Sequence, residues 1–133
     1  MVTDRIGDFI IRLQNAAMVD KRDVSVPFSS HLVAIAKKLK ELGFIDSIET
    51  KEKEGSAAKT IAVTLTYGTR GKAKLRGVRR LSKPGRRMYE SHLKAHRVKG
   101  GTGARIISSP LGIVSDTEAR KTKVGGEELF EVW

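Results

Sequence analysis

The sequence predicts an α+β protein made of two small lobes, and three observations lead to this fold class. In residues 1–66, apolar residues follow helical and strand spacing in the order α-β-α-β-β. Beyond residue 66 the pattern changes to short strands and short helices. The charge changes at the same place, because residues 1–66 carry 10 Lys/Arg against 9 Asp/Glu and residues 67–133 carry 16 against 6. We therefore expect an N-terminal α/β lobe over 1–66 and a basic, mostly β lobe over 67–133.

Two amphipathic helices are predicted in the N-terminal lobe, because their apolar residues recur every three or four positions. The first covers 4–17, and the carboxylate of Asp4 can cap its N-terminus. The second begins after Ser29 or Ser30, either of which can cap it, and Gly43 can close it.

Three strands accompany these helices. Residues 24–28 alternate between apolar and polar side chains, and Pro27 indicates that this strand ends there or lies at an edge of its sheet. Another strand begins at 44–48 and gives way to a polar hairpin loop at 51–59. The return strand, 60–67, has the clearest alternation.

The C-terminal lobe is predicted to contain short strands at 75–81, 86–89 and 104–108. Turn residues occupy 82–85, and 93–98 can form a short helical turn.

A third helix is predicted at 116–122, because Ser115 and Glu118 have the capping-box spacing in which each side chain satisfies an unpaired backbone donor. Two glycines at 125–126 are expected to stop this helix. Residues 129–133 then read as a terminal strand.

Composition excludes several classes of protein. The chain has no cysteine, so disulfides, thiolate metal sites and a cysteine nucleophile are absent. No apolar run approaches the roughly 18 to 20 residues that cross a bilayer, and the acidic residues near the N-terminus do not fit a secretory signal. We expect a soluble, cytoplasmic protein that does not act at a membrane.

Catalytic and metal-binding motifs are weak. His92 and His96 have helical spacing, but no glutamate lies between them and no third ligand is evident. The glycines at 100–103 lack the Gly-Lys-Ser/Thr of a phosphate-binding loop, and a mobile loop is the simpler interpretation. We therefore expect no catalysis, no metal, no cofactor and no small-molecule substrate.

The basic surplus is concentrated in residues 70–105, which hold 13 Lys/Arg and the single acid Glu90. Such a field attracts a polyanion, because each neutralised phosphate releases condensed counterions. A solvated surface kept for solubility is the alternative. The bases best suited to phosphate oxygens surround a Pro-Gly turn and are Arg79, Arg80, Lys83, Arg86 and Arg87.

Polar and aromatic residues beside these bases fit RNA in particular. Tyr89 can stack on an unpaired base, although a tyrosine in a strand can equally belong to the core. Ser108, Ser109 and Pro110 begin a tight loop whose two hydroxyls can reach sugar hydroxyls or base edges, and a plain turn is the alternative. Further candidate RNA-binding bases are Arg105, Arg120 and Lys121.

The chain closely resembles the bacterial small-subunit ribosomal protein S-eight family, nearly from end to end. The resemblance rests on several motifs in the right order: TDRIGD at 3–8 with Arg12 and Asn15, LSKPGRRMY at 81–89, GARIISSPLG at 103–112, and TEARK and VGGE at 117–121 and 124–127. It implies a non-catalytic, two-lobe α+β protein that binds the central domain of 16S rRNA beside other small-subunit ribosomal proteins. Proteins of that family also bind their own operon mRNA and repress its translation, so this mRNA is a further expected partner.

The resemblance also implies particular RNA contacts. The family's Ser-Thr-Ser loop corresponds to Ser108, Ser109 and Pro110, the tyrosine after the Pro-Gly turn to Tyr89, and the glutamate after Gly-Gly to Glu127. We expect these residues to shape recognition, while the bases of 70–105 set affinity. A second group of candidate RNA-binding residues lies in the N-terminal lobe and comprises Thr3, Asp4, Arg12, Asn15, Ser29 and Ser30.

Two other classes of function are open alternatives. An RNA-modifying enzyme would need a cofactor loop or an acid/base pair, and turnover or binding of a methyl donor would favour it. A basic membrane-surface protein would need a helix with Lys and Arg on its polar face, but the two clear helices carry mixed charge.

Overall fold

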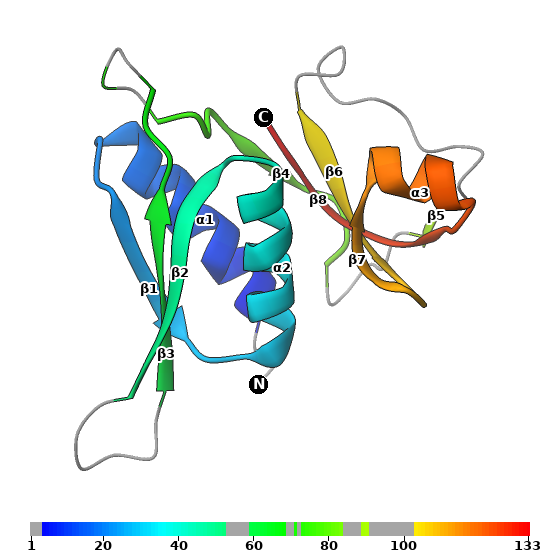
Figure 1. The fold of residues 1–133 in the computed structure, drawn as a ribbon, viewed down its shortest axis with the longest axis horizontal. Helices are drawn as coiled ribbons and strands as arrows, with labels where there is room; N and C mark the ends of the chain where they lie inside the picture. Colours follow the sequence, from blue (N-terminus) through cyan, green and yellow to red (C-terminus); the bar gives the residue numbers. More distant parts are fainter. Residues whose placement is uncertain (1–3, 53–58, 69–70, 72, 84–88, 91–102) are drawn as a thin grey trace. The chain divides into compact units, whose positions relative to one another are not determined.

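The computed structural model describes residues 4–52, 59–68, 71, 73–83, 89–90 and 103–133 (Figure 1). Contacts divide the chain into two compact units, one formed by Asp8–Arg76 and the other by Met1–Gly7 with Gly77–Trp133. The described residues form three helices and two antiparallel sheets, which confirms the predicted α+β class. In chain order the elements are α1 (Arg5–Met18), β1 (Asp23–Pro27), α2 (Ser30–Glu41), β2 (Ile45–Glu52), β3 (Lys59–Leu65), β4 (Val78–Arg80), β5 (Tyr89–Glu90), β6 (Ala104–Ser109), β7 (Gly112–Ser115), α3 (Asp116–Thr122) and β8 (Gly126–Val132).

The unit Asp8–Arg76 contains a three-stranded sheet with the order β1-β3-β2, so β1, which ends at Pro27, is the predicted edge strand. Figure 1 shows α1 and α2 on the same side of this sheet. On the central strand β3, Ile61, Val63 and Leu65 are buried and alternate with more exposed residues. Because successive side chains of a strand point to opposite faces, one face of the sheet forms the core against the helices.

Both helices bury the apolar face that their spacing predicts. Phe9 and Leu13 of α1 and Ile35 and Leu39 of α2 are fully buried. Burying each such side chain stabilises the fold by about 1.5 to 3 kcal/mol. This packing, rather than helix propensity, holds helices of 14 and 12 residues in place.

The helix ends largely follow the predicted caps. The Asp4 carboxylate accepts a hydrogen bond of 3.0 Å from the Gly7 N–H at the start of α1. Ser29 is the N-cap of α2 by its backbone conformation, although its side chain makes no capping hydrogen bond there. Beyond the other end of α2, Gly43 has a φ of +90°, which a glycine adopts without strain.

The segment after β3 belongs with the first unit up to Arg76. The Tyr67 hydroxyl donates to the Lys21 carbonyl at 2.9 Å, and the Lys74 N–H donates to the Thr66 carbonyl at 2.8 Å. These bonds tie the segment to the N-terminal sheet. The lobe boundary expected at residue 67 stays a prediction, because division by contacts does not test which segments fold independently.

The second unit is built on a sheet with the order β4-β8-β6-β7, in which β5 also pairs with β8. One face is covered by α3, where Ile107, Val114 and Ala119 form a buried cluster. Ile106 and Phe130 are fully buried as well, and they are opposite each other in register. The predicted strand at 104–108 is confirmed by β6. A terminal strand is confirmed as well, but β8 begins at Gly126, three residues before the predicted start at 129.

The hairpin loop predicted at 51–59 is too long. Strand β2 continues to Glu52 and β3 begins at Lys59, so Lys51 pairs with Thr60 and Glu52 with Lys59. The Lys59 ammonium lies 3.4 Å from the Glu52 carboxylate. Polar side chains that face solvent on both strands do not interrupt the backbone ladder, which is why composition misplaced the loop.

Three further differences lie in the second unit. Only Val78–Arg80 of the strand predicted at 75–81 is a strand, and β7 was not predicted at all. Helix α3 ends as predicted at Thr122, but the residue that ends it is Lys123, with a left-handed φ of 58°, and not the glycines at 125–126. The predicted helical turn at 93–98 lies outside the described residues, as does most of the strand predicted at 86–89.

Candidate nucleic-acid interface

Three residues that are far apart in the sequence are register neighbours across three strands of the second unit. Tyr89 of β5 pairs with Glu127 of β8, and Glu127 pairs on its other side with Ser108 of β6. Paired residues of neighbouring strands have their Cβ atoms only about 4.5 to 5.5 Å apart. The structure therefore brings together the positions 89, 108 and 127 that the sequence singles out.

A β-bulge creates this register. The pairing runs from Ile106 opposite Phe130 to Ile107 opposite Glu128, so β8 contributes one extra residue, Leu129, at this point. Without the bulge, regular alternation would place Glu128 opposite Ser108. The bulge thus selects Glu127 as the partner of Ser108 and leaves Glu128 on the other face.

The Glu127 carboxylate is held by a hydrogen bond within the lobe. The hydroxyl of Ser82, a buried residue that follows β4, donates to Glu127 Oε2. Backbone hydrogen bonds from Leu81 and Ser82 to the Leu129 carbonyl fix Ser82 beside β8. A carboxylate fixed in this way can accept hydrogen bonds from amino groups but repels phosphates.

Gly126 allows β8 to approach the β6–β7 hairpin closely. A Cβ atom at this position would lie 2.1 Å from the Ser108 carbonyl oxygen and 3.0 Å from the Ser109 Cα. Both are backbone atoms, which cannot move aside as a flexible side chain could. Only glycine fits here without displacing the strand that carries Ser108.

The turn of the hairpin is organised by Ser109. Its hydroxyl donates to the Gly112 carbonyl at 2.8 Å and accepts from the Leu111 N–H at 3.2 Å. Gly112 has a φ of +109°, and Leu111 is two-thirds exposed at the tip. The loop predicted at 108–112 is therefore the turn of a hairpin formed by β6 and β7.

Arg105 lies in a buried ion-pair network with two glutamates of β8. Its Nη1 is 3.0 Å from Glu128 Oε1 and its Nη2 is 2.5 Å from Glu131 Oε1. Burial alone would lower the pKa of Arg105, but its hydrogen bonds and the charges of Glu131 and Glu128 outweigh burial and raise the pKa above its usual value. The guanidinium of this candidate RNA-binding residue thus cross-links the lobe itself.

Two other candidate arginines also lie in ion pairs. Arg80 pairs with Asp4, itself a candidate RNA contact. Arg120 Nη1 lies 3.1 Å from Asp116 Oδ2, and the other oxygen of this buried carboxylate accepts from the Arg105 N–H at 3.1 Å. These contacts give the arginines structural roles in the second unit, and their contacts with RNA stay predictions.

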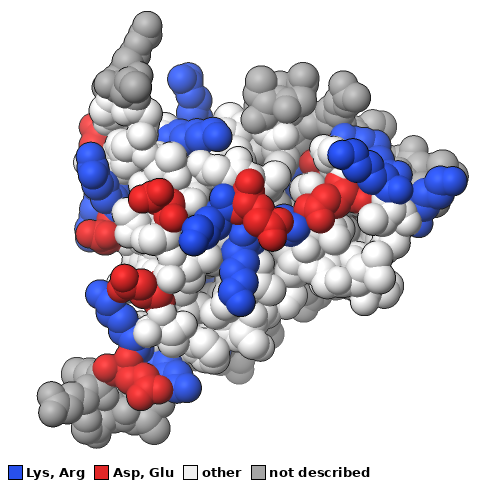
Figure 2. All heavy atoms as spheres, in the orientation of Figure 1, with Lys and Arg blue, Asp and Glu red and all other residues white. Residues whose placement is uncertain are grey.

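Other candidate bases are exposed. Arg79, Lys83 and Lys121 are all exposed in the second unit. Figure 2 shows basic side chains gathered over α3, the element that carries Lys121, with acidic side chains beside them. Arg86 and Arg87 lie outside the described residues.

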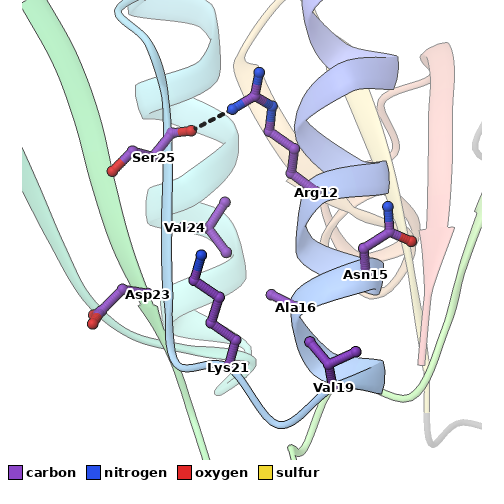
Figure 3. Close-up of a pocket in the computed structure, with 8 residues that line it drawn as sticks. All are labelled: Arg12, Asn15, Ala16, Val19, Lys21, Asp23, Val24 and Ser25. Atoms are coloured by element: carbon purple, nitrogen blue, oxygen red, sulfur yellow. Dashed lines mark hydrogen bonds between the residues drawn. The ribbon is translucent and has the colours of Figure 1, made fainter.

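In the N-terminal unit, Arg12 and Asn15 line a pocket of about 530 Å³ between α1 and β1 (Figure 3). The Arg12 guanidinium reaches across to β1 and donates to the Ser25 carbonyl at 2.9 Å. It also lies 3.1 Å from the Asp8 carboxylate. Ala16 and Val24 form part of the apolar wall, so the pocket offers a cation and an apolar surface together.

Two of the remaining predicted positions, Ser29 and Ser30, lie at the start of α2 and line neither site. Ser30 is exposed and Ser29 half-buried at the start of α2, while Thr3, His92 and His96 lie outside the described residues. Within the described ranges, no group of three or more His, Asp and Glu side chains could hold a metal ion. In the same part of the chain, no helix has the length and apolar character needed to cross a membrane.

Two residues at the interface were missed by sequence reasoning. Ser82 appeared only as a turn residue, and Gly126 only as a helix stop. Their positions against Glu127 and Ser108 depend on strand register, which composition does not specify. The Gly-Gly pair at 125–126, which lies outside the helix, was the one available signal of a close backbone approach.

Known proteins resemble this chain over its full length. The family model described as Ribosomal protein S8 matches residues 4–133. The small ribosomal subunit protein uS8 of Sorangium cellulosum is 41% identical over 133 residues, which cover 100% of each chain. The protein of the same name from Chloroflexus aggregans is 42% identical over 132 residues, covering 99% of this chain and 98% of the relative.

Proposed function

Because the chain belongs to the ribosomal protein S8 family, we propose that it is a structural protein of the small ribosomal subunit that binds the central domain of 16S rRNA through its C-terminal lobe. The family is structural and non-enzymatic, so an RNA-modifying activity is set aside. Neighbouring small-subunit proteins are its further proposed partners.

The RNA-binding proposal rests on one observation: Tyr89, Ser108 and Glu127 are neighbours in register across three strands. We call these three residues the register cluster. A hydroxyl and a fixed carboxylate side by side suit the edge of a base that offers an amino group, because the carboxylate can only accept hydrogen bonds. Such edges are accessible where an RNA helix is irregular or a base is unpaired. The cluster therefore supports recognition of structured RNA.

Affinity and recognition come from different residues in this proposal. Exposed bases such as Arg79, Lys83 and Lys121 attract any phosphate backbone and contribute affinity without sequence preference. The Glu127 carboxylate repels phosphate groups and accepts hydrogen bonds from the amino groups of base edges. A carboxylate in a basic lobe thus adds affinity for an RNA with the matching base edge and not for phosphate backbones in general.

The experiment compares Glu127→Gln with the unaltered protein on a fragment of the 16S central domain and on a random RNA duplex. Hydrogen bonds to charged groups contribute about 1.5 to 3 kcal/mol, so we expect a loss of roughly 10- to 100-fold on the 16S fragment and little change on the duplex. Glu49→Gln removes an exposed carboxylate on β2 and is the matched control.

Equal effects of Glu127→Gln on both RNAs would contradict a role in recognition. The identity of the RNA is tested separately, by crosslinking the protein in cells and sequencing the RNA that co-purifies. Enrichment of a region outside 16S rRNA and outside the protein's own operon would overturn the proposal.

Binding of the protein's own operon mRNA is a second proposed function, and the same cluster supports it. An mRNA segment that presents the same base edges would compete with the 16S fragment for one site. We expect Glu127→Gln to weaken both RNAs by the same factor in a competition assay. A variant that loses one RNA and keeps the other would show that the two sites differ.

A further inference from the structure

We infer that the two serines of the β6–β7 hairpin have different roles: Ser109 is a positioning residue that builds the turn, and Ser108 presents the hydroxyl that reads RNA. This division rests on the proposed function, because it concerns the same site. It sharpens the expectation that both serines contact RNA.

The hydroxyl of Ser109 is already used within the turn. A serine hydroxyl has one donor hydrogen, and Ser109 gives it to the Gly112 carbonyl at 2.8 Å. The same oxygen accepts from the Leu111 N–H at 3.2 Å. Ser109 could donate to RNA only by giving up the bond to Gly112 that closes the hairpin.

The two serines also lie on opposite faces of the sheet, because they are consecutive in β6. Ser109 shares its face with Ile107, which packs in the cluster beneath α3. Ser108 is opposite Glu127 in register and shares the face of that carboxylate. Only Ser108 can therefore act together with Glu127 on one nucleotide.

No hydrogen bond joins the side chain of Ser108 to the part of the chain that the structure describes, and the residue is only partly buried. Its hydroxyl can thus donate or accept. Beside the acceptor Glu127, it fits an unpaired nucleotide that offers an exocyclic amino group together with a ring nitrogen or a 2′-hydroxyl.

The brace formed by Ser109 has a physical purpose. The ring of Pro110 fixes φ at one position of the turn. The hydroxyl of Ser109 then holds the backbone of Leu111 and Gly112 through its two hydrogen bonds. A turn that is ordered before binding loses less conformational entropy when RNA arrives. Ser109 therefore acts on binding through the position of its neighbours.

The test uses three variants of the full chain: Ser108→Ala, Ser109→Ala and Ser109→Thr. Two quantities are measured for each, the dissociation constants for the 16S fragment and a random duplex, and the hydrogen-exchange rate of the Leu111 amide by NMR. The amide rate reports the brace, since this N–H donates to Ser109. A direct contact between Ser109 and RNA would not alter it in the protein alone.

We expect Ser108→Ala to weaken binding to the 16S fragment by roughly 3- to 10-fold, as for the loss of one hydrogen bond, with an unchanged Leu111 exchange rate. Ser109→Ala should weaken binding and accelerate Leu111 exchange together. Ser109→Thr keeps the hydroxyl and should restore both quantities.

Weaker binding by Ser109→Ala with an unchanged Leu111 exchange rate would overturn the division of roles, and so would full binding by Ser108→Ala. In either case selective binding of the 16S fragment by the unaltered protein would leave the proposed function standing. If the unaltered protein binds the 16S fragment no better than the random duplex, the proposed function and this inference both fail.

Discussion

At the scale of single residues, the proposed site depends on backbone approach as much as on side-chain chemistry. Glu127 is the residue with the chemistry, but Gly126 beside it allows β8 to lie against the carbonyl of Ser108. The bulge at Leu129 then sets which glutamate faces Ser108. A substitution in β8, such as one at Gly126, can therefore move the polar groups of the site without replacing any of them.

Gly126→Ala tests this dependence. The added methyl group meets the Ser108 carbonyl, so we expect a loss of about 1 to 3 kcal/mol in unfolding free energy, the usual cost of overpacking. Urea unfolding measures the loss, and binding of the 16S fragment should weaken with it. Leu111→Ala, at the exposed tip of the same hairpin, is the control and should change stability by less than about 0.5 kcal/mol. A Gly126→Ala protein as stable as the control would show that β8 adjusts freely.

Arg105→Ala separates a structural role from an RNA contact. The change removes the ion pairs that Arg105 makes with Glu128, which is almost fully buried, and with Glu131. Breaking a buried ion pair costs about 3 to 5 kcal/mol, so we expect a large fall in urea stability. Lys121→Ala, which removes an exposed base of the same lobe, should leave stability unchanged. If Arg105→Ala is as stable as Lys121→Ala and only RNA binding falls, the buried ion-pair network does not stabilise the fold.

At the scale of elements, the sequence predicted the parts that are formed by local periodicity. Helix α1, helix α2 and strand β3 have apolar spacing that matches their buried faces, and Asp4 and Gly43 mark helix ends by local chemistry. Such features depend on neighbours in the chain. These helices, this strand and these caps can therefore be predicted from the sequence without knowledge of the tertiary structure.

The features that were missed depend on residues far away in the chain. Strand β7 is only four residues long and is defined by its pairing with β6, and Lys51 and Glu52 belong to β2 because Lys59 and Thr60 pair with them. At the candidate site, the resemblance indicated positions 89, 108 and 127. Neither the resemblance nor composition revealed the buried ion pairs of Arg105 or the opposite faces of Ser108 and Ser109.

Tyr67 offers a pH-dependent test of how the segment after β3 is anchored. Burial and the nearby charge of Asp20 raise the pKa of its phenol above the usual 10.0, and Arg22 only partly opposes them. Since the folded state favours the neutral phenol, its contribution to stability is complete below pH 10 and is lost as the pH rises through the folded-state pKa. In a Tyr89→Phe variant, Tyr67 is the only tyrosine, and ultraviolet titration should give a higher pKa folded than in urea. Identical values would indicate that Tyr67 is not held against the sheet.

At the scale of the whole molecule, the proposed attraction to RNA depends on the basic surplus and on how much of it is neutralised within the protein. The chain has a formal net charge of +11, but Arg80, Arg105 and Arg120 are paired with carboxylates. In the proposed function, the exposed bases of the second unit are the ones that contact phosphates. The salt dependence of binding should follow the number of exposed bases and not the formal charge.

Lys83→Ala measures one such contribution. We expect weaker binding to the 16S fragment and to a random duplex alike, and a slope of log K against log salt that is smaller in magnitude by roughly 0.7 to 0.9. Lys51→Ala removes an exposed lysine from β2 and is the control for general charge. The same change in slope for both variants would mean that RNA responds to net charge and not to the C-terminal lobe.

The central position of β8 has a consequence for the order in which the protein becomes functional during synthesis. Strands β4, β5 and β6 all pair with β8, which follows them in the chain, and β4 precedes it by about 50 residues. Before β8 has been synthesised, β6 can pair only with β7, its neighbour in the chain, and Glu127 is not yet beside Ser108. In the proposed function, a nascent chain therefore acquires selectivity for RNA only when β8 has paired with β6.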